Sequence, residues 1–296
     1  MDNGRPLIAG IGELLWDVFP DRKTAGGAPV NFVYHAACMG AEGCAVSAVG
    51  NDVSGTEIIR ALEENRIRNC IARVAYPTGS VLVELTDGSP SYTIVEDVAW
   101  DYLPLTQQAV DFVKRADAVC FGTLAQRSPV ARGTVRALLE QAPANALLFF
   151  DINLRQHYYS RELIEESLRK ANVFKLNDDE LVTLRDMFGL EGSDGEVCRT
   201  VMERYGLRYL ILTAGSVSST VYSPAETSVI PTPRVTVADT VGAGDAFSGA
   251  FVYSILTGKP LREAHRKAVD VAAFVCSRHG AWPPYGEAAL PDAAKS

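Results

Sequence analysis

Residues 239–251 have the sequence Asp-Thr-Val-Gly-Ala-Gly-Asp-Ala-Phe-Ser-Gly-Ala-Phe, a turn of small residues that runs directly into an apolar helix. The first N–H groups of a helix lack partners within it, and glycines let an anion approach them closely. We therefore expect the N–H groups of this turn, where Gly242 and Gly244 leave room, to face an anion such as a phosphate group. Asp245 falls in the first helical turn, where it can accept a proton from a hydroxyl that attacks this phosphate. The alternative is an ordinary tight turn in which Asp245 is only a favourable charge at a helix N-terminus.

Two other nucleotide-binding motifs do not occur in the sequence. A G-x-x-x-x-G-K-[ST] loop is absent, so the expected phosphate site is not of the Walker type. The segment Gly10-Ile11-Gly12 follows an apolar run but lacks the third glycine of the dinucleotide fingerprint. This absence argues against a nicotinamide-dependent oxidoreductase.

The composition is that of an ordinary globular protein. The chain has 296 residues, 47% of them hydrophobic and 22% charged, which suits one large α/β domain with a sizeable core. The formal net charge of −8 has the wrong sign for the electrostatic attraction that drives nucleic-acid binding. Apolar runs are too short to span a bilayer, and no cationic signal-peptide start is present. We therefore expect a cytoplasmic protein with neither nucleic acid nor membrane as a partner.

The cysteines and histidines form no recognisable metal or disulfide pattern. The six cysteines are scattered without a C-x-x-C pair, and the four histidines lie at no metal-ligand or catalytic spacing. We expect reduced, mostly buried thiols and histidines that are structural or exposed.

Short apolar runs alternate with segments of helical periodicity along most of the chain, which predicts a mainly parallel sheet flanked by helices. The expected strands are 7–12, 45–50, 118–122, 146–152, 173–176 and 209–213. The expected helices are 29–40, 54–65, 106–115, 128–141, 160–171, 178–188, 194–205, 244–257 and 261–278. Ser54 and Ser160 are candidate N-caps of two of these helices.

One region departs from this alternation. Residues 79–85 and 92–95 have alternating side chains on either side of the turn dipeptide Asp87-Gly88, which predicts an antiparallel hairpin. Such a hairpin does not fit easily into a parallel sheet. We therefore expect it to form, together with residues 16–26, a small flap over one edge of the sheet.

With the segment 239–251 and a second signature at 26–55, the chain resembles the PfkB, or ribokinase-like, carbohydrate kinases, and among them most closely the bacterial fructokinases. Two separated signatures carry the resemblance, residues 239–251 and the segment Gly-Gly-Ala-Pro-Val-Asn-Phe at 26–32, which continues through Gly40 to Val-Gly-Asn-Asp-Val-Ser-Gly at 49–55. Residues 12–20 and 98–101 add segments typical of fructokinases. The resemblance implies a Rossmann-like, mainly parallel α/β sheet flanked by helices. It also implies a single kinase domain over 1–296, with a small β lid formed from about 13–26 and 78–102.

The resemblance further implies ATP-dependent phosphorylation of a sugar hydroxyl, with Mg²⁺ as cofactor and Asp245 as general base. It also implies that Gly242, Ala243 and Gly244 form the anion hole. The fructokinase-like segments favour D-fructose as substrate and fructose 6-phosphate as product. Ribose, 2-keto-3-deoxygluconate and nucleosides stay open as substrates, because a few pocket and lid contacts decide specificity. A non-catalytic, sugar-sensing relative would be expected to lose the base or the anion hole, and both are present. A homodimer that forms through the β lid is common in the family.

The matching positions of the family place Asp17, Gly27 and Asn31 in the sugar site. A carboxylate and an amide can hold neighbouring hydroxyls, while Gly27 lets backbone approach the ring. The alternatives are an exposed acid at a strand end, a turn glycine and a helix-capping amide. Trp16 and Trp100 are candidates for apolar faces against the sugar or for buried aromatics of the lid.

Residues 151–155, Asp-Ile-Asn-Leu-Arg, resemble the D-x-N-x-R segment of sugar kinases. Strand alternation would put Asp151, Asn153 and Arg155 on one side, where the Arg155 guanidinium can bind phosphate or sugar in a bidentate way. A surface salt bridge is the alternative for this arginine.

Residues 177–180, Asn-Asp-Asp-Glu, resemble the N-x-x-E motif of the family. The resemblance implies that Asn177 and Glu180 organise Mg²⁺ and phosphate through water, which suits an ion that keeps part of its hydration. The alternative is a helix N-cap followed by acids in the first turn.

Residues 213–216 match the family's T-x-G turn, in which Thr213 and Gly215 would contact ATP. Ser218 stands where many relatives have another glycine, so this loop is expected to be stiffer.

Residues 278–281 resemble the R-x-G-A turn that, with backbone at Asp239 and Val241, can form a monovalent cation site including Gly280. Pro284 stands where potassium-dependent relatives offer a serine hydroxyl, which argues against activation by K⁺.

Overall fold

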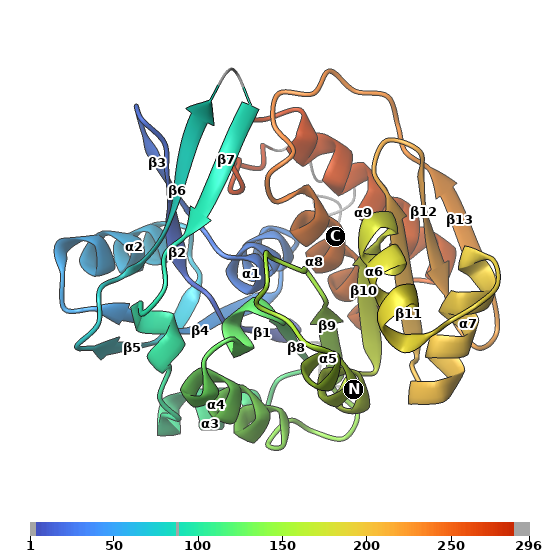
Figure 1. Cartoon of the computed structure of the whole chain (residues 1–296), viewed down its shortest axis with the longest axis horizontal. Coiled ribbons are helices and arrows are strands. Elements are labelled where there is room, and N and C mark those ends of the chain that lie inside the picture. The colour runs from blue at the N-terminus through green and yellow to red at the C-terminus, as the bar shows by residue number, and fades with distance from the viewer. Residues whose placement is uncertain (1–3, 87–88, 287–296) are drawn as a thin grey trace.

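A nine-stranded sheet forms the centre of the computed structural model, which describes residues 4–86 and 89–286 (Figure 1). The strand order is β13-β12-β11-β10-β9-β8-β1-β4-β5. All neighbours from β5 to β11 are parallel, whereas β12 and β13 extend the sheet beyond β11 as antiparallel strands. The bounds are β1 Leu7–Ile11, β4 Glu42–Gly50, β5 Arg68–Val74, β8 Ala118–Gly122, β9 Leu147–Asp151, β10 Val173–Asn177, β11 Tyr209–Ala214, β12 Ser218–Tyr222 and β13 Thr227–Pro231.

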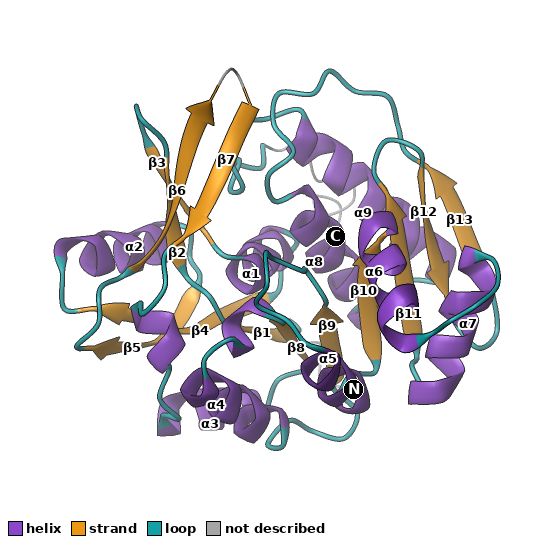
Figure 2. Cartoon of the chain, viewed as in Figure 1, coloured by secondary structure: helices purple, strands orange, loops and turns teal. Residues whose placement is uncertain are grey.

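Helices cover both faces of this sheet (Figure 2). One hydrophobic core joins the sheet to α1, α2, α8 and α9, and a second joins it to α3, α4, α5, α6 and α7. Both faces are therefore buried, which is why the central strands are mainly apolar. The bounds are α1 Ala28–Cys38, α2 Val53–Glu64, α3 Gln107–Val113, α4 Pro129–Leu139, α5 Arg161–Lys170, α6 Asp178–Phe188, α7 Asp194–Tyr205, α8 Ala243–Leu256 and α9 Leu261–Cys276. The predicted fold class is confirmed.

The helix starts follow local side-chain chemistry. Ser160 caps α5, since its hydroxyl accepts the Leu163 N–H at 3.2 Å as predicted. Ser54 is not a cap, because α2 begins one residue earlier. Asp52 takes that place, and its carboxylate accepts the Gly55 N–H at 2.6 Å. A carboxylate is an equally good cap and adds a favourable charge at the helix N-terminus.

A second sheet, with the strand order β3-β2-β6-β7, stands apart from the large one (Figure 1). The pairs β2/β3 and β6/β7 are antiparallel, and β2 and β6 are parallel. The predicted hairpin and the 16–26 segment thus combine in one small sheet, while the expected turn Asp87-Gly88 lies outside the described residues. The bounds are β2 Leu15–Val18, β3 Lys23–Gly26, β6 Gly79–Thr86 and β7 Ser89–Ile94.

The base of the small sheet has its own apolar cluster around Trp100. This side chain is 1% exposed, and the Arg127 guanidinium lies 3.9 Å from its ring centroid. Arg127 also forms a buried, bidentate ion pair with Asp101, at 2.7 and 2.8 Å. Trp100 is therefore a buried aromatic of this sheet and presents no face to a sugar. Trp16 is half-buried and donates its indole N–H to the Ser54 carbonyl at 3.1 Å.

Candidate active site

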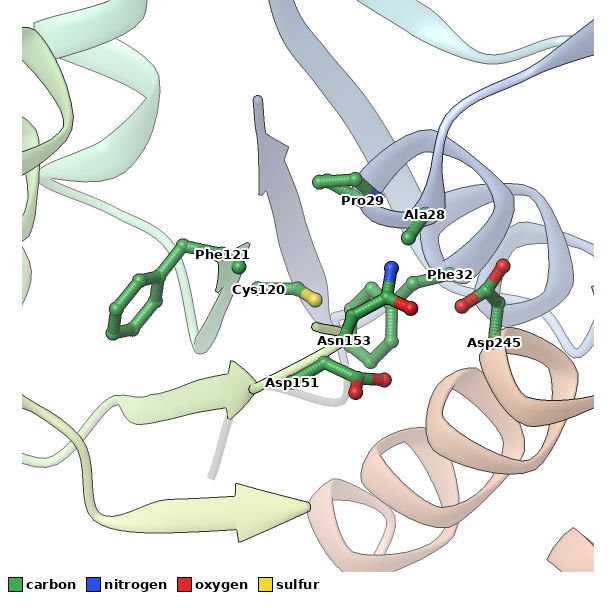
Figure 3. Close-up of a pocket in the computed structure, with 9 residues that line it drawn as sticks. Ala28, Pro29, Phe32, Cys120, Phe121, Asp151, Asn153 and Asp245 are labelled. Atoms are coloured by element: carbon green, nitrogen blue, oxygen red, sulfur yellow. The ribbon is translucent and has the colours of Figure 1, made fainter. Parts of the chain in front are cut away.

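The candidate site lies where strands and helices meet at the carboxyl edge of the large sheet. Strands β9 and β10 end at Asp151 and Asn177, and in open α/β sheets ligands bind beyond such ends. The starts of α1 and α8 reach the same place, because Ala28, Asp151 and Asp245 line one small cavity. Figure 3 shows Asp151 and Asn153 on one side of this cavity and Asp245 extending from the start of α8 on the other.

The turn before α8 depends on glycine at position 242. Gly242 has a φ of 78°, in the left-handed region, and a Cβ there would lie 2.9 Å from the Cβ of Ala281 and 3.0 Å from its Cα. The first intrahelical hydrogen bond joins the Ala246 N–H to the Gly242 carbonyl at 2.8 Å. The amides of Gly244 and Asp245 precede this bond and are left without helical partners. This is the geometry expected of an anion hole.

Ala243 contributes less to this hole than Gly244. The Ala243 N–H donates to the Thr240 carbonyl at 3.3 Å, a long bond that closes the turn. Gly244 is exposed, so its backbone is open to a ligand.

Asp245 sits in the predicted first turn of α8 and is fixed by two further side chains. Asn31 Nδ2 donates to Asp245 Oδ2 at 2.8 Å, and Trp282 Nε1 donates to Asn31 Oδ1 at 2.8 Å. An indole nitrogen can only donate, so it fixes the Asn31 amide with its NH₂ group towards Asp245. Asp245 Oδ1 makes no such contact with the described residues and is the oxygen that would be free to accept a proton.

The surroundings of Asp245 make it a suitable base. Burial and the nearby Asp151 carboxylate raise the pKa of Asp245 to about 6, while Lys175, the Asn31 hydrogen bond and Arg155 oppose this rise. A carboxyl with a pKa just below neutral is mostly ionised at pH 7 and is still a stronger base than an ordinary aspartate.

A buried ion pair lies beneath the anion hole. Lys175 Nζ is 2.7 Å from Asp151 Oδ2, and the two side chains are only 9% and 8% exposed. A Cβ on Gly244 would lie 3.4 Å from Lys175 Nζ, so the ammonium group is in van der Waals range of the turn. Although burial favours the neutral amine, Asp151 and Glu180 raise the pKa of Lys175 above its ordinary value and keep it charged.

The residues expected at the sugar site lie around the start of α1. Gly27 precedes this helix with a φ of 121°, and a Cβ there would lie 2.1 Å from the Glu13 carbonyl oxygen, so only glycine fits. Asp17, on β2, is half-buried; burial and the charge of Asp239 raise its pKa to about 6. Asn31 lies one turn into α1 and joins this region to the base.

Glu13 is a buried carboxyl that the sequence analysis did not single out. It is 2% exposed, Oε1 accepts the Ala28 N–H at 3.2 Å, and Oε2 has no hydrogen-bond partner within the described chain. Burial, with a smaller contribution from Asp245, raises the pKa of Glu13 to about 7.

Asn177 and Glu180 form a reciprocal capping box at the start of α6. Asn177 Oδ1 accepts the Glu180 N–H at 2.8 Å, and Glu180 Oε2 accepts the Asn177 N–H at 2.8 Å. Glu180 Oε1 accepts the Leu154 N–H at 2.9 Å, which ties α6 to the loop after β9. The two residues therefore form the helix cap expected as the alternative. Each oxygen of the Glu180 carboxylate already accepts one N–H, so only its second lone pair is left for a water bound to a metal ion.

The carboxylates of this region would suit a magnesium ion that arrives with ATP. In residues 4–86 and 89–286, His, Cys, Asp and Glu side chains form no group of three or more that could hold a metal ion. Mg²⁺ usually keeps several waters and takes one or two carboxylates together with substrate phosphates. Burial and the nearby Asp151 carboxylate raise the pKa of Glu180 above its ordinary value. Its carboxylate would be one candidate partner for such an ion.

Thr213 and Gly215 lie at the far end of the same edge. Asn177 and Thr213 are partners in the β10–β11 register, and Gly215 follows β11 with a φ of 46° and exposed backbone. Arg155 is exposed and donates to the adjacent Leu154 carbonyl at 3.0 Å. Strand β9 already ends at Asp151, and Asn153 has a φ of 39°, so the expected alternation from 151 to 155 does not occur.

Asp239 connects the anion-hole turn to the C-terminal segment. Its Oδ1 accepts the Val241 N–H at 3.0 Å, and its Oδ2 accepts the Gly280 N–H at 3.1 Å. The three residues expected at a monovalent cation site are thus together, joined by this carboxylate.

Comparison with known proteins agrees with this geometry. The profile of the pfkB family carbohydrate kinase matches residues 12–286. The chain belongs to the pfkB family of carbohydrate kinases. It is therefore a sugar kinase, an ATP-binding phosphotransferase with the ribokinase-like fold. No helix within the described ranges has the length and apolar character needed to cross a membrane.

Relatives of this pfkB kinase cover nearly its whole length. It is 30% identical over 298 residues to an uncharacterized sugar kinase, PH1459, of Pyrococcus horikoshii, covering 93% of this chain and 92% of that protein. It is 24% identical over 283 residues to a fructokinase of Rhizobium leguminosarum bv. trifolii, covering 90% and 85%. The crystal structure of a fructokinase with bound ATP from Xylella fastidiosa superimposes with a TM-score of 0.82 at 23% identity, over 93% of both chains. The last likeness shows the fold.

Proposed function

We propose that the protein transfers the γ-phosphoryl group of MgATP to the primary hydroxyl of D-fructose, giving ADP and fructose 6-phosphate. The observation that carries the proposal is Asp245, placed in the first turn of α8 with one carboxylate oxygen held by Asn31 at 2.8 Å. A hydroxyl that reaches the free oxygen of Asp245 lies beside the open amides of the same turn. In-line phosphoryl transfer needs a base and an anion site in this relation.

In the proposed reaction the sugar oxygen forms a bond to the γ-phosphorus. The bond from that phosphorus to the β–γ bridging oxygen breaks, its electron pair leaves with ADP, and the hydroxyl proton passes to Asp245. The turn at Gly242–Gly244 stabilises charge on the phosphoryl oxygens during transfer. Mg²⁺, when bound, neutralises charge on the ATP phosphates. Asn177 and Glu180 are proposed to orient its water shell, and Thr213 and Gly215 to contact the nucleotide.

The sugar is proposed to lie between the small sheet and the start of α1. Asp17 and Asn31 offer a carboxylate and an amide from these two elements, and Gly27 brings backbone close without a side chain. Arg155 is proposed to turn from the Leu154 carbonyl to the bound sugar or phosphate. The small sheet acts as a lid that excludes water, which favours transfer to sugar over hydrolysis of ATP.

The choice of fructose is supported by relatives that carry that name. The Rhizobium protein is a fructokinase, although only 24% identical. In this proposal the whole of 1–296 acts as one cytoplasmic kinase domain. Two such domains form a homodimer through their lids, and the exposed face of each lid includes Leu82, which is 40% exposed. The cluster of Asp239, Val241 and Gly280 is the proposed place for a monovalent cation.

The test is a coupled assay of ADP release with MgATP against fructose, ribose, 2-keto-3-deoxygluconate, glucose and adenosine, compared by kcat/KM. The Asp245→Asn variant is the background control for every substrate. A preference for fructose that disappears in this variant supports the proposal. Preference for another sugar would overturn the substrate and leave the base in place, and equal turnover by the variant would overturn the base.

A further inference from the structure

We propose that Lys175 is a positioning residue of the phosphate site, with its ammonium group, anchored by Asp151, acting as a fixed positive charge beneath the anion hole. The inference rests on the proposed phosphoryl transfer. It assigns a role to a strand residue that none of the matched motifs includes.

The position of Lys175 follows from the register of β10. Phe174 and Leu176 pack into the core with α3–α7, so alternation sends Lys175 to the opposite face, towards α8. There its Nζ meets Asp151 at 2.7 Å, from the neighbouring strand β9. Both groups stand on neighbouring strands of the central sheet, which restricts their movement.

The ion pair is oriented. A Cβ on Gly244 would lie 3.4 Å from Lys175 Nζ and 3.8 Å from Lys175 Cε. No atom of Asp151 lies within 4 Å of that point. The positive end of the pair therefore faces the turn whose amides are open to a phosphate. A charge at this position adds to the helix N-terminus and to the amides at no cost of reorganisation when the phosphate arrives.

The charge balance of the site requires such a cation. Asp151 from β9, Glu180 from α6 and Asp245 from α8 all act on Lys175, and Asp245 also acts on the buried Glu13. ATP would add phosphate charges to this acidic site. Arg155 is the other cation that acts on Asp245, and it is exposed on a loop.

Stability alone does not account for the pair. Removing two charges from water is expensive, and well-packed apolar residues in place of a buried ion pair are often as stable or more so. The loss of one partner, in contrast, leaves an uncompensated buried charge. A structural role and an electrostatic role therefore predict different results when both charges are removed together.

The experiment compares Lys175→Met, Asp151→Asn and the double variant, with Lys170→Met as a control for loss of one exposed positive charge on α5. Melting temperature and kcat are measured for each, with the best sugar of the panel. We expect Lys175→Met to lower both, with kcat falling about 100-fold, as for loss of one preorganised donor. The double variant should recover the melting temperature and not kcat. Recovery of both would overturn the proposal, because it would make the pair purely structural.

A second measurement needs no sugar and so separates this proposal from the choice of substrate. MgATP should raise the melting temperature of the wild type and of Asp245→Asn, because binding to the folded state stabilises it. The rise should be lost in Lys175→Met and in the double variant, and Lys175→Arg, which keeps the charge, should restore part of it. An undiminished rise in the two charge-deleted variants would overturn the role of Lys175 even if fructose is not the substrate.

The acidic limb of the kcat/KM profile gives a sign test for the same charges. Lys175 lowers the pKa of Asp245 and Asp151 raises it. Lys175→Met should therefore move the limb to higher pH and Asp151→Asn should move it to lower pH. Movement of both in one direction, or of neither, would contradict the proposed arrangement.

Discussion

At the scale of single residues, Asp245 is the group on which the proposed chemistry depends. Asp245→Asn keeps the size and the contact with Asn31 but cannot take a proton, so kcat should fall by about two to four orders of magnitude while the KM for ATP changes little. Steady-state kinetics with both substrates checks this. Asp186→Asn, an exposed acid on α6, is the matched control. A variant at Asp245 with near-normal turnover would exclude it as the base.

Trp282 provides a second residue-scale prediction. Trp282→Phe keeps the stacking on Tyr34, where the ring centroids lie 5.5 Å apart, but deletes the donor that orients Asn31. One such hydrogen bond is worth about 1 kcal/mol, so kcat/KM should fall roughly fivefold. The acidic limb of the kcat/KM profile should also move to higher pH, because the hydrogen bond from Asn31 lowers the pKa of Asp245.

Tyr34→Phe is the control for this prediction. It removes one hydrogen bond, to the Pro283 carbonyl at 2.7 Å, from the same aromatic stack. It should loosen the C-terminal segment without changing the Asn31 amide, so its kcat/KM should stay close to the wild type. Equal losses in the two variants would show that Trp282 acts only through packing.

Sequence analysis could predict the site residues that belong to short, continuous motifs. Glycines before an apolar helix, followed by Asp245, carry their chemistry in adjacent positions. Lys175 and Glu13 depend on what other strands place around them, and sequence spacing does not give that. One signal was available for Lys175, because a lysine inside the apolar run 173–176 must be paired if it is buried. Trp282 lies 251 positions from Asn31, and no local pattern connects them.

At the scale of elements, the start of α8 combines a left-handed residue with close packing. Gly242→Ala puts a Cβ on a φ of 78° and within 3.0 Å of Ala281, whereas Gly258→Ala meets nothing within 4 Å at a φ of 80°. The second variant isolates the backbone strain, about 1 kcal/mol. Gly242→Ala should lower the free energy of unfolding, measured with urea, by clearly more than Gly258→Ala. It should also lose activity, because the turn at 280–281 must move away from the anion hole. Equal stability losses would contradict the role of this contact.

The helices and the central strands of the large sheet, which are buried on both faces, could be predicted from the sequence. All nine expected helices form within the described residues. Most have an apolar stripe of helical period, whereas α1 and α8 are buried almost all round. The strands β5, β12 and β13 were not predicted. β5 and β13 are the edge strands of the large sheet, and β12 lies beside β13. β13 alternates buried and exposed side chains, and β5 mixes polar and apolar residues. Edge strands lack the continuous apolar run that marks central parallel strands, and they depend on pairing with a neighbour.

At the scale of the whole molecule, buried titratable groups act on stability in opposite directions. Burial lowers the pKa of His35 to about 3 and of His265 to about 4, so these histidines cost stability as the pH falls below the ordinary histidine value. Glu13, Asp17 and Asp245 have raised pKa values of about 7, 6 and 6, and they cost stability as the pH rises. The two sets overlap between about pH 4 and 7 and partly cancel in the wild type.

The Glu13→Gln variant separates the effect of the buried carboxyls from that of the buried histidines. The variant and the wild type have the same histidines, so their difference in stability at any one pH comes from Glu13. The carboxyl of Glu13 is neutral in the folded protein below a pKa of about 7, whereas in the unfolded chain it ionises from 4.5 upwards. The folded state therefore loses up to about 3 kcal/mol relative to the unfolded state as the pH rises from 4.5 to 8. The glutamine cannot ionise, and its oxygen can still accept the Ala28 N–H. At pH 8 the variant should melt several degrees higher than the wild type, and at pH 4.5 the two should melt together.

The control is Glu63→Gln, an exposed change on α2, which should leave the melting temperature unchanged at both pH values. Calorimetry at pH 4.5 and 8 for the three proteins is sufficient. A gain at pH 8 would mean that the fold keeps an unfavourable buried carboxylate next to Asp245, as expected of a group retained for function at the expense of stability. A variant less stable than the wild type at pH 8 would mean that the ionised carboxylate stabilises the start of α1 by more than its burial costs. Burial would then not be the dominant effect on this residue.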